Sequence, residues 1–345
     1  MMTPQNVLAY GSFESAVTFE HNGAPVVGSR RIAEAENRIF AGLFDSIYQT
    51  LCDSPDQQTA DRVLDELFVS LRERKLNSLP SDWTEFVKFC RRHPLMSLLH
   101  RDPFTYRAYS KPRGYAGDAE MMDYIYGREE RWSAPEADSI GRSIFNFTTQ
   151  APASEGVRSR RAFIAARIDR LAEEIRNPHI LSIASGHLRE VNLSAAVRRC
   201  KTGRIVALDA DALSLAEVQR SYDAYGVETV NTSFREMLGS QNKLGEFDFV
   251  YSTGLFDYLS QRAARRLVTG MFRMLRPGGR LLVANFLPGI RDIGYMEAFM
   301  DWNLVYRSRR EMVDLTMGIP EEEVKEVTIV SEECRNIVFL QLTRN

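Results

Sequence analysis

Residues 179–190, HILSIASGHLRE, decide the fold of this 345-residue chain. The apolar run 179–184 is typical of a buried strand, and it ends in the small residues Ser185 and Gly186. A helical spacing of apolar residues begins directly afterwards, at Leu188. A strand, a tight glycine turn and a helix together present backbone N–H groups and a helix N-terminus to a nucleotide-like ligand. The stretch therefore predicts a ligand-binding turn at the carboxyl end of the first strand of an α/β sheet.

Strand-like and helical segments alternate from here to the C-terminus. The strand-like runs cover residues 180–185, 204–209, 227–234, 247–252, 280–286, 324–330 and 336–342. Helical segments separate the first five, which predicts a parallel sheet covered by helices on both faces. Only residues 331–335 lie between the last two runs, whereas a parallel crossover needs roughly a dozen residues, so these two strands pair antiparallel if they are neighbours. We expect a seven-stranded, mostly parallel, doubly wound sheet with an antiparallel C-terminal strand.

The composition is that of a soluble globular protein, because 44% hydrophobic and 26% charged residues are enough to build a core. The 44 basic and 46 acidic residues give a net charge of −2, which argues against electrostatic binding to nucleic acid or to an anionic membrane. No apolar run is long enough to cross a bilayer, and the first residues lack the basic and apolar regions of a signal peptide. We therefore expect a cytoplasmic protein with a small-molecule substrate, no nucleic-acid partner and no membrane insertion.

The cysteines and histidines are too dispersed to suggest a metal site. The four cysteines occur singly, at Cys52, Cys90, Cys200 and Cys334, without the spacing of a disulfide framework or of a metal centre. Single cysteines fit a reducing compartment. The sequence predicts no bound metal.

The N-terminal part of the chain is predicted to be helical. Apolar residues recur at helical spacing over about 32–51, 63–71 and 83–89, and the simplest interpretation of these stripes is helix packing. We expect a helical N-terminal region over residues 1–150 and an α/β domain over 151–345.

Residues 101–127, RDPFTYRAYSKPRGYAGDAEMMDYIYG, stand out within the helical region because they combine five tyrosines with several charged residues. Pro112 and two glycines exclude a regular helix over 112–117. Aromatic and charged side chains gathered on an irregular segment favour a lid over a polar ligand.

Polar residues at the predicted strand ends are the candidates for ligand binding. Asp209 ends the second strand about 20 residues beyond Gly186, where an acid accepts hydrogen bonds from ribose hydroxyls. Asp211 could share this role, but we favour it as the N-cap of a helix that begins near Ala212. The full set of candidate cofactor-binding residues is Arg158, Arg161, Ser182, Ala184, Ser185, Gly186, Asp209, Ala210, Ser233, Phe234, Ser252, Thr253 and Gly254.

From about residue 179 onward the sequence resembles the class I S-adenosylmethionine-dependent methyltransferases, whose fold is Rossmann-like. More narrowly, it is similar to the extracellular-factor 3-hydroxypalmitic acid methyl ester synthases from about residue 101 to the end. The segments that carry this likeness are DPFTYRAYSKPRGYAGDAEMMDYIY (102–126), SGHLREVNLS (185–194), YSTGLFDYLSQRAARRL (251–267), LRPGGRLLVANF (275–286) and MEAFMDWNLVYR (296–307). The same subfamily is related to the azetidine-2-carboxylate synthases, which cyclise S-adenosylmethionine and release 5′-methylthioadenosine.

The resemblance implies S-adenosylmethionine as the cofactor, or as the substrate itself. The first interpretation is methylation of the carboxylate of a hydroxy-fatty acid or a similar small acid. The alternative is an azetidine-2-carboxylate synthase, in which the amine of S-adenosylmethionine attacks its own Cγ. A third interpretation is a non-catalytic module that binds the cofactor.

The first motif of the family departs from its usual pattern here. The family has an acid on the strand, two residues before the first glycine of the turn, whereas this chain has Ser182 there and Ala184 in place of that glycine. The acid normally helps to hold the α-ammonium of the cofactor, and Glu190 or Asp118 could substitute for it. A missing acid would make the amine easier to deprotonate, which a cyclase needs.

Aromatic faces stabilise a sulfonium cation. The candidate catalytic residues are Tyr115, Asp118, Tyr295, Trp302 and Tyr306. Arg158 or Arg161 is expected to bind the carboxylate of the cofactor.

Overall fold

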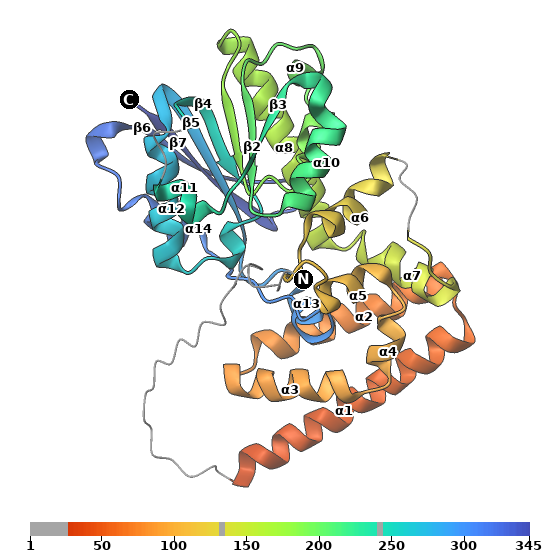
Figure 1. The fold of residues 1–345 in the computed structure, drawn as a ribbon. Coiled ribbons are helices and arrows are strands. Elements are labelled where there is room, and N and C mark those ends of the chain that lie inside the picture. The colour runs from red at the N-terminus through yellow and green to blue at the C-terminus, as the bar shows by residue number, and fades with distance from the viewer. Residues whose placement is uncertain (1–26, 131–134, 240–243) are drawn as a thin grey trace, which may run out of the picture. The chain divides into compact units, whose positions relative to one another are not determined.

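The computed structural model describes residues 27–130, 135–239 and 244–345, and the chain divides into two compact units (Figure 1). The first unit contains the described residues up to Ala151 together with Arg291–Asn303. The second unit contains Pro152–Ile290 and Leu304–Asn345. None of the helices in the described ranges combines the length and the hydropathy needed to cross a membrane.

The second unit is built on one seven-stranded sheet with the strand order β3-β2-β1-β4-β5-β7-β6. The strands are β1 (Ile180–Ile183), β2 (Ile205–Asp209), β3 (Val227–Asn231), β4 (Phe247–Ser252), β5 (Leu275–Phe286), β6 (Val324–Ser331) and β7 (Ile337–Arg344). The five strands from β3 to β5 pair in parallel, whereas β7 pairs antiparallel with both β5 and β6. This confirms the predicted doubly wound sheet with its antiparallel C-terminal strand, which is the arrangement of the class I methyltransferase fold.

Helices cover both faces of the sheet, because its strands carry apolar side chains on each face. Leu181 and Val206 belong to the core that also contains the apolar face of α12 (Gln261–Arg273). Phe339 points the other way and stacks on Phe163 of α8 (Pro152–Glu174), with ring centroids 4.3 Å apart. In Figure 1, α8 and α10 (Ala212–Tyr222) lie on one side of the sheet and α12 on the other.

The shorter elements of the second unit are η1 (Arg189–Asn192), α9 (Ala195–Arg198), η2 (Asp223–Tyr225), α11 (Phe234–Gly239), η4 (Phe256–Tyr258), α14 (Arg309–Val313), η5 (Asp314–Thr316) and η6 (Glu321–Glu323). One boundary differs from the prediction: β5 begins at Leu275, whereas the predicted strand begins at residue 280. Leu275 already pairs with Phe247, and the register shifts before Phe249 pairs with Arg280. An irregular, bulged pairing therefore extends the strand beyond its predicted start.

The first unit consists of helices. They are α1 (Val27–Asp53), α2 (Gln57–Leu76), α3 (Pro80–Arg92), α4 (Leu95–Leu99), α5 (Pro103–Ser110), α6 (Ala119–Glu130), α7 (Ser139–Thr148) and α13 (Ile293–Phe299). The predicted apolar stripes form its core, in which Phe44, Leu64 and Phe86 are fully or almost fully buried.

Helix α13 belongs to this helical unit, although the sequence analysis places it in the α/β domain. Tyr295 stacks on Phe68 of α2 with ring centroids 4.4 Å apart. Glu297 accepts hydrogen bonds of 2.6 Å from Trp83 Nε1 and from Lys75 Nζ. The reason for the difference is that α13 is buried on every side, and the sequence pattern of such a helix does not identify its neighbours.

Candidate functional site

The turn after β1 contacts the end of β2 through a backbone N–H group. Ala184 and Gly186 both have a φ of +52°, a left-handed conformation that is easy for glycine and costs energy for alanine. The N–H of Gly186 donates to Asp209 Oδ2 at 2.8 Å, and the N–H of Asp211 donates to Asp209 Oδ1 at 2.9 Å. The carboxylate of Asp209 therefore holds both turns, the one after β1 and the one after β2. Ser185 precedes Gly186 in the first turn, and Ala210 follows Asp209 in the second.

The helix predicted directly after the glycine turn is a short 3-10 turn in the structure. Leu188 is itself left-handed, with a φ of +53°, and only the 3-10 turn η1 follows it. The next helix, α9, starts separately, because Ser194 caps it and Asp169 accepts hydrogen bonds from Ser194 Oγ and from the N–H of Ala196. A 3-10 turn therefore lies next to the glycine turn, in place of the predicted α-helix N-terminus.

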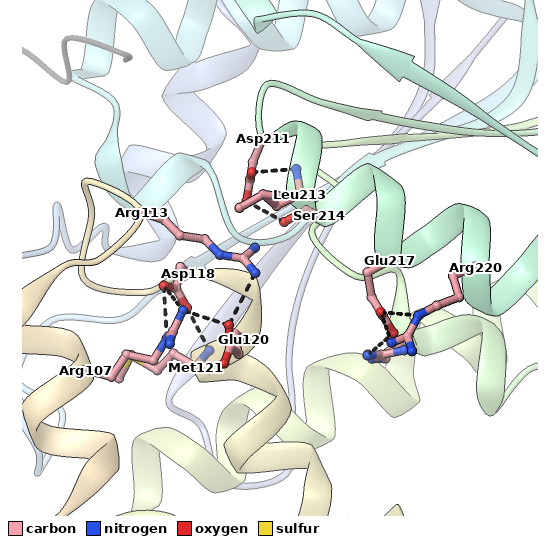
Figure 2. Close-up of polar contacts among 11 residues, drawn as sticks. Arg107, Arg113, Asp118, Glu120, Met121, Asp211, Leu213, Ser214, Glu217 and Arg220 are labelled. Atoms are coloured by element: carbon pink, nitrogen blue, oxygen red, sulfur yellow. Dashed lines mark hydrogen bonds and ion pairs between the residues drawn. The ribbon is translucent and has the colours of Figure 1, made fainter. Parts of the chain in front are cut away.

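Asp211 is the N-cap of α10, as the sequence analysis favours. Its Oδ1 accepts from the N–H of Leu213 at 3.0 Å, and its Oδ2 accepts from the hydroxyl of Ser214 at 2.8 Å (Figure 2).

Ser233 and Phe234, two of the candidate cofactor-binding residues, lie just after β3. Ser233 forms a capping box with Glu236 at the start of α11, because each side chain accepts from the backbone N–H of the other residue. The hydroxyl of Ser233 is thus engaged in capping, and its role in cofactor binding stays a prediction. Phe234 begins α11, and its side chain lies outside the described part of the chain.

The end of β4 has the features of a ligand site. Ser252 is fully buried, and its hydroxyl has no hydrogen-bond partner among the described residues. Such an orphaned group is costly unless a ligand or a water satisfies it. Gly254 is exposed, and a Cβ added there would meet no atom within 4 Å. The carbonyl of Thr253, between them, accepts a hydrogen bond from Arg160.

Arg160 is a residue that the sequence analysis missed. It is 7% exposed, on the buried face of α8 together with Arg161, which is 2% exposed. Arg158, which with Arg161 is a candidate for binding the cofactor carboxylate, forms an ion pair of 2.5 Å with Glu155 one turn earlier. Arg160 is the arginine whose hydrogen bond reaches the end of β4.

A chain of polar side chains crosses the same face of the sheet. Ser182 and Tyr251 are paired neighbours in β1 and β4 and are almost fully buried. The hydroxyl of Tyr251 donates to Glu190 Oε1. Burial raises the pKa of Glu190, although the hydroxyl of Tyr251 and the charges of Arg160 and Arg161 lower it. Ser182 lies beside Tyr251 in the neighbouring strand, and the carboxylate that Tyr251 contacts is that of Glu190.

Asp257 follows β4 and is buried, with its Oδ1 accepting from the N–H of Phe286 at 2.8 Å. Burial raises the pKa of Asp257 to about 6. The unfolded state, with an aspartate pKa of about 3.9, loses the proton first as the pH rises, so this group makes folding less favourable between about pH 4 and pH 6.

Replacing Asp257 with asparagine is expected to remove this pH dependence, because an amide oxygen still accepts from Phe286 but does not titrate. The free energy of unfolding of Asp257→Asn, relative to the wild type, should rise by about 1–3 kcal/mol between pH 4 and pH 7. Urea unfolding of both proteins across this range measures the difference. Parallel pH curves would show that Asp257 has an ordinary pKa.

In the first unit, Asp118 makes structural contacts, and its role in catalysis stays a prediction. It is fully buried, and Arg107 donates to its Oδ1 at 2.9 Å and to its Oδ2 at 2.8 Å, while the N–H of Met121 donates to Oδ1 at 2.8 Å (Figure 2). Glu120 accepts from both Arg107 and Arg113. The irregular segment is thus held by a charge network, with α5 before it and α6 after it, and Tyr115 lies half-buried within it.

Tyr295 lies in the core of the helical unit, and its role in catalysis stays a prediction. It is 1% exposed, and its hydroxyl forms a hydrogen bond of 2.9 Å with Thr105 Oγ1 inside the helical unit. Trp302 is buried in the first unit, whereas Tyr306 is half-buried in the second unit. Roles for Tyr115, Trp302 and Tyr306 in catalysis stay predictions.

Comparison with known proteins bears on the second unit. Residues 180–279 match the model of a family described as a methyltransferase domain. None of the curated proteins matches this sequence.

Three solved structures illustrate what the search of known structures found. A possible exported protein from Bordetella parapertussis is 13% identical, with a TM-score of 0.53, and the alignment covers 93% of this chain and 99% of that one. The N-methyltransferase NodS from Bradyrhizobium japonicum is 13% identical, with a TM-score of 0.40 and coverage of 54% and 96%. The magnesium protoporphyrin IX methyltransferase from Synechocystis, with bound SAM, is 12% identical, with a TM-score of 0.40 and coverage of 66% and 98%. At these identities the likeness concerns the fold alone.

The sheet of the second unit and the family match lead to the same assignment. The match begins at the first residue of β1 and ends within β5, so it contains the glycine turn, Asp209 and the end of β4. The second unit therefore has the fold of the class I methyltransferases, and residues 180–279 within it match a methyltransferase domain.

Proposed function

We propose that the protein is an S-adenosylmethionine-dependent methyltransferase that methylates the carboxylate of a hydroxy-fatty acid or a similar small acid. The observation that carries the proposal is the hydrogen bond from Gly186 to Asp209 at the carboxyl ends of β1 and β2, inside the segment that matches the methyltransferase domain. In open α/β sheets, ligands bind at this edge, where the strand order reverses. In this sheet, that crevice lies between β1 and β4.

The residues at this edge suit a nucleoside with a charged tail. Asp209 is half-buried, and an acid at the end of the second strand accepts from ribose hydroxyls. The orphaned hydroxyl of Ser252 and the open space at Gly254 leave room for a ligand at the end of β4. When bound, S-adenosylmethionine supplies an electrophilic methyl group, which passes to the acceptor oxygen while the carbon–sulfur bond breaks and its electron pair stays on sulfur.

A carboxylate is an acceptor that can be methylated without a general base. A carboxylate is ionised near neutral pH, so the enzyme needs no general base and has to align the acceptor oxygen and exclude water. The specific acceptor follows from the resemblance to methyl ester synthases. The lid role of residues 101–127, the cytoplasmic location and the lack of a nucleic-acid partner belong to the same proposal.

The alternative, cyclisation to azetidine-2-carboxylate, is favoured by one observation. Glu190 is a carboxylate whose pKa burial raises, and it lies on the face of the sheet where Ser182 replaces the usual acid. Such a group can accept a proton from an amine that must become a nucleophile. In this reaction the nitrogen–Cγ bond forms, the Cγ–sulfur bond breaks, and 5′-methylthioadenosine leaves with the electron pair.

Incubation of the purified protein with S-adenosylmethionine, with and without 3-hydroxy-fatty acids, tests both reactions by mass spectrometry. S-adenosylhomocysteine and a methyl ester, formed only when the acid is present, would support the methyltransferase. Catalytic formation of 5′-methylthioadenosine and a four-membered imino acid without the acid would establish the cyclase instead. If the cofactor binds but survives every acceptor, the protein is a non-catalytic binding module.

Replacing Asp209 with alanine is expected to weaken the binding of S-adenosylmethionine by about 1–3 kcal/mol, because the ribose hydroxyls and the N–H of Gly186 lose their acceptor. Titration calorimetry measures the change. The control is Asp211→Asn, which removes a neighbouring charge but keeps the helix cap and should change the affinity by less than about twofold. Equal affinities of Asp209→Ala and the wild type would remove Asp209 from the site.

A further inference from the structure

Arg167 of α8 has no acidic partner among the described residues. Its guanidinium group lies over the ring of Phe163, with 4.4 Å between Cζ and the ring centroid, and Phe163 stacks in turn on Phe339 of β7. The Nε of Arg167 is buried, and no described residue accepts a hydrogen bond from it. A buried donor without an acceptor is costly unless a ligand or a water satisfies it.

Two further arginines lie close to Arg167. Burial and the positive charges of Arg170 and Arg280 lower the pKa of Arg167, because like charges disfavour the charged form. Glu174 is the acid that these two arginines share. It accepts from Arg170 Nε at 3.0 Å and forms an ion pair with Arg280. One carboxylate therefore serves three guanidinium groups, which leaves two positive charges in excess.

Strand β7 adds neutral hydrogen-bonding groups beside these charges. Side chains two residues apart in a strand point to the same face of the sheet, so Gln341 and Thr343 share the α8 face with Phe339. Thr343 is the strand neighbour of Arg280. Both polar side chains are half-buried, and neither forms a hydrogen bond with a described residue.

We propose that Arg167, Arg170 and Arg280 bind a phosphate group, either free or as the monoester of a larger molecule. Gln341 and Thr343 supply further hydrogen-bond donors. The planar guanidinium group matches the oxygens of a phosphate, to which it can donate two parallel hydrogen bonds.

The charge balance favours a dianion over a carboxylate. Three arginines and Glu174 carry a net charge of about +2, which a phosphate monoester neutralises near neutral pH. Glu326 of β6 pairs with Thr343 across the strands, but its carboxylate accepts from Thr328 and contacts no arginine in the described part of the chain. It therefore leaves the excess positive charge in place.

The phosphate site is separate from the candidate cofactor site. Arg160 reaches Thr253 at the carboxyl end of β4, whereas Arg167 follows about two turns later on the same helix, about 10 Å further along its axis. Arg280 pairs with Phe249, which lies nearer the start of β4. The proposal is thus independent of the proposed function.

Thermal unfolding of the full-length protein, with inorganic phosphate titrated at constant ionic strength, tests the site. A bound anion raises the unfolding temperature along a saturable curve, which we expect to reach half its height at millimolar phosphate. Phosphate also stabilises proteins through exclusion from their surface, without saturation and without dependence on one arginine. The saturable part is therefore the signal.

Arg167→Gln removes the charge and is expected to weaken phosphate binding about 10-fold or more. Thr343→Val removes one hydroxyl at nearly constant shape and should weaken it about 2- to 5-fold. The matched control is Arg310→Gln, an exposed arginine of α14, which should leave the curve unchanged. The affinity of Arg167→Gln for S-adenosylhomocysteine should equal that of the wild type, since the variant keeps its fold and the two sites are separate.

Glycerol 3-phosphate distinguishes the two sources of the ligand. An affinity equal to that of inorganic phosphate supports a site for the free ion, and a tighter one supports a site for a monoester. A wild-type curve without saturation overturns the proposal. So does a saturable curve that Arg167→Gln leaves unchanged, because the phosphate then binds elsewhere. Neither result bears on whether the protein uses S-adenosylmethionine.

Discussion

Replacing Arg307 with methionine is expected to lower the free energy of unfolding of the second unit by about 3–5 kcal/mol. Arg307 is 1% exposed, and its guanidinium group donates to the carbonyls of Phe256 and Leu259, to Asn285 Oδ1 at 2.6 Å and to Gln261 Oε1 at 2.8 Å. Methionine fills similar space but donates to none of these oxygens. The loss is large because buried acceptors without a donor are costly.

Arg310→Met is the matched control, because this arginine is exposed on α14. Its substitution should change stability by less than about 0.5 kcal/mol. Urea unfolding of both variants measures the difference. Equal stabilities would mean that water replaces the guanidinium group, and that the segment after β4 is more open than the structure indicates.

Replacing Gly294 with alanine is expected to destabilise the helical unit by about 3 kcal/mol. A Cβ at this position would lie 2.5 Å from the carbonyl carbon and oxygen of Leu71, and backbone atoms within α2 cannot move aside cheaply. Neighbouring Tyr295 and Glu297 would lose their contacts as α13 is displaced.

Gly42→Ala provides the opposite control in the same unit. Gly42 lies within α1, and a Cβ there meets nothing within 4 Å, so alanine should stabilise the protein by about 0.5–1 kcal/mol. Thermal unfolding of the two variants should therefore shift in opposite directions. A stable Gly294→Ala protein would show that α13 packs less closely than described.

The sequence predicts the sheet well because its signals are local. Strand runs, connection lengths and the position of Asp209 depend on neighbouring residues, and the structure confirms the antiparallel pairing that was inferred from the short segment 331–335. Asp211 is likewise predicted as an N-cap from its position before a helix.

The parts of the site that the sequence does not reveal depend on distant residues. Tyr251 and Glu190 meet only because β1 and β4 are adjacent in the sheet and η1 turns back toward them. Alternation along β1 and β4 could have placed Ser182 and Tyr251 side by side once the strand order was assumed. Arg160 has no such signal, because three arginines between residues 158 and 161 look alike in sequence.

The assignment of Arg291–Asn303 to the helical unit has a consequence for synthesis on the ribosome. Most multidomain chains fold their N-terminal part first, as soon as it emerges. Here the helical unit lacks α13 until strands β1 to β5 have been translated, and until then the surfaces of Phe44, Phe68 and Trp83 that α13 covers lack their partner. Helices α1 to α7 are therefore made before the sheet but complete their fold only after β5, and nascent chains that stop before residue 291 should depend on chaperones.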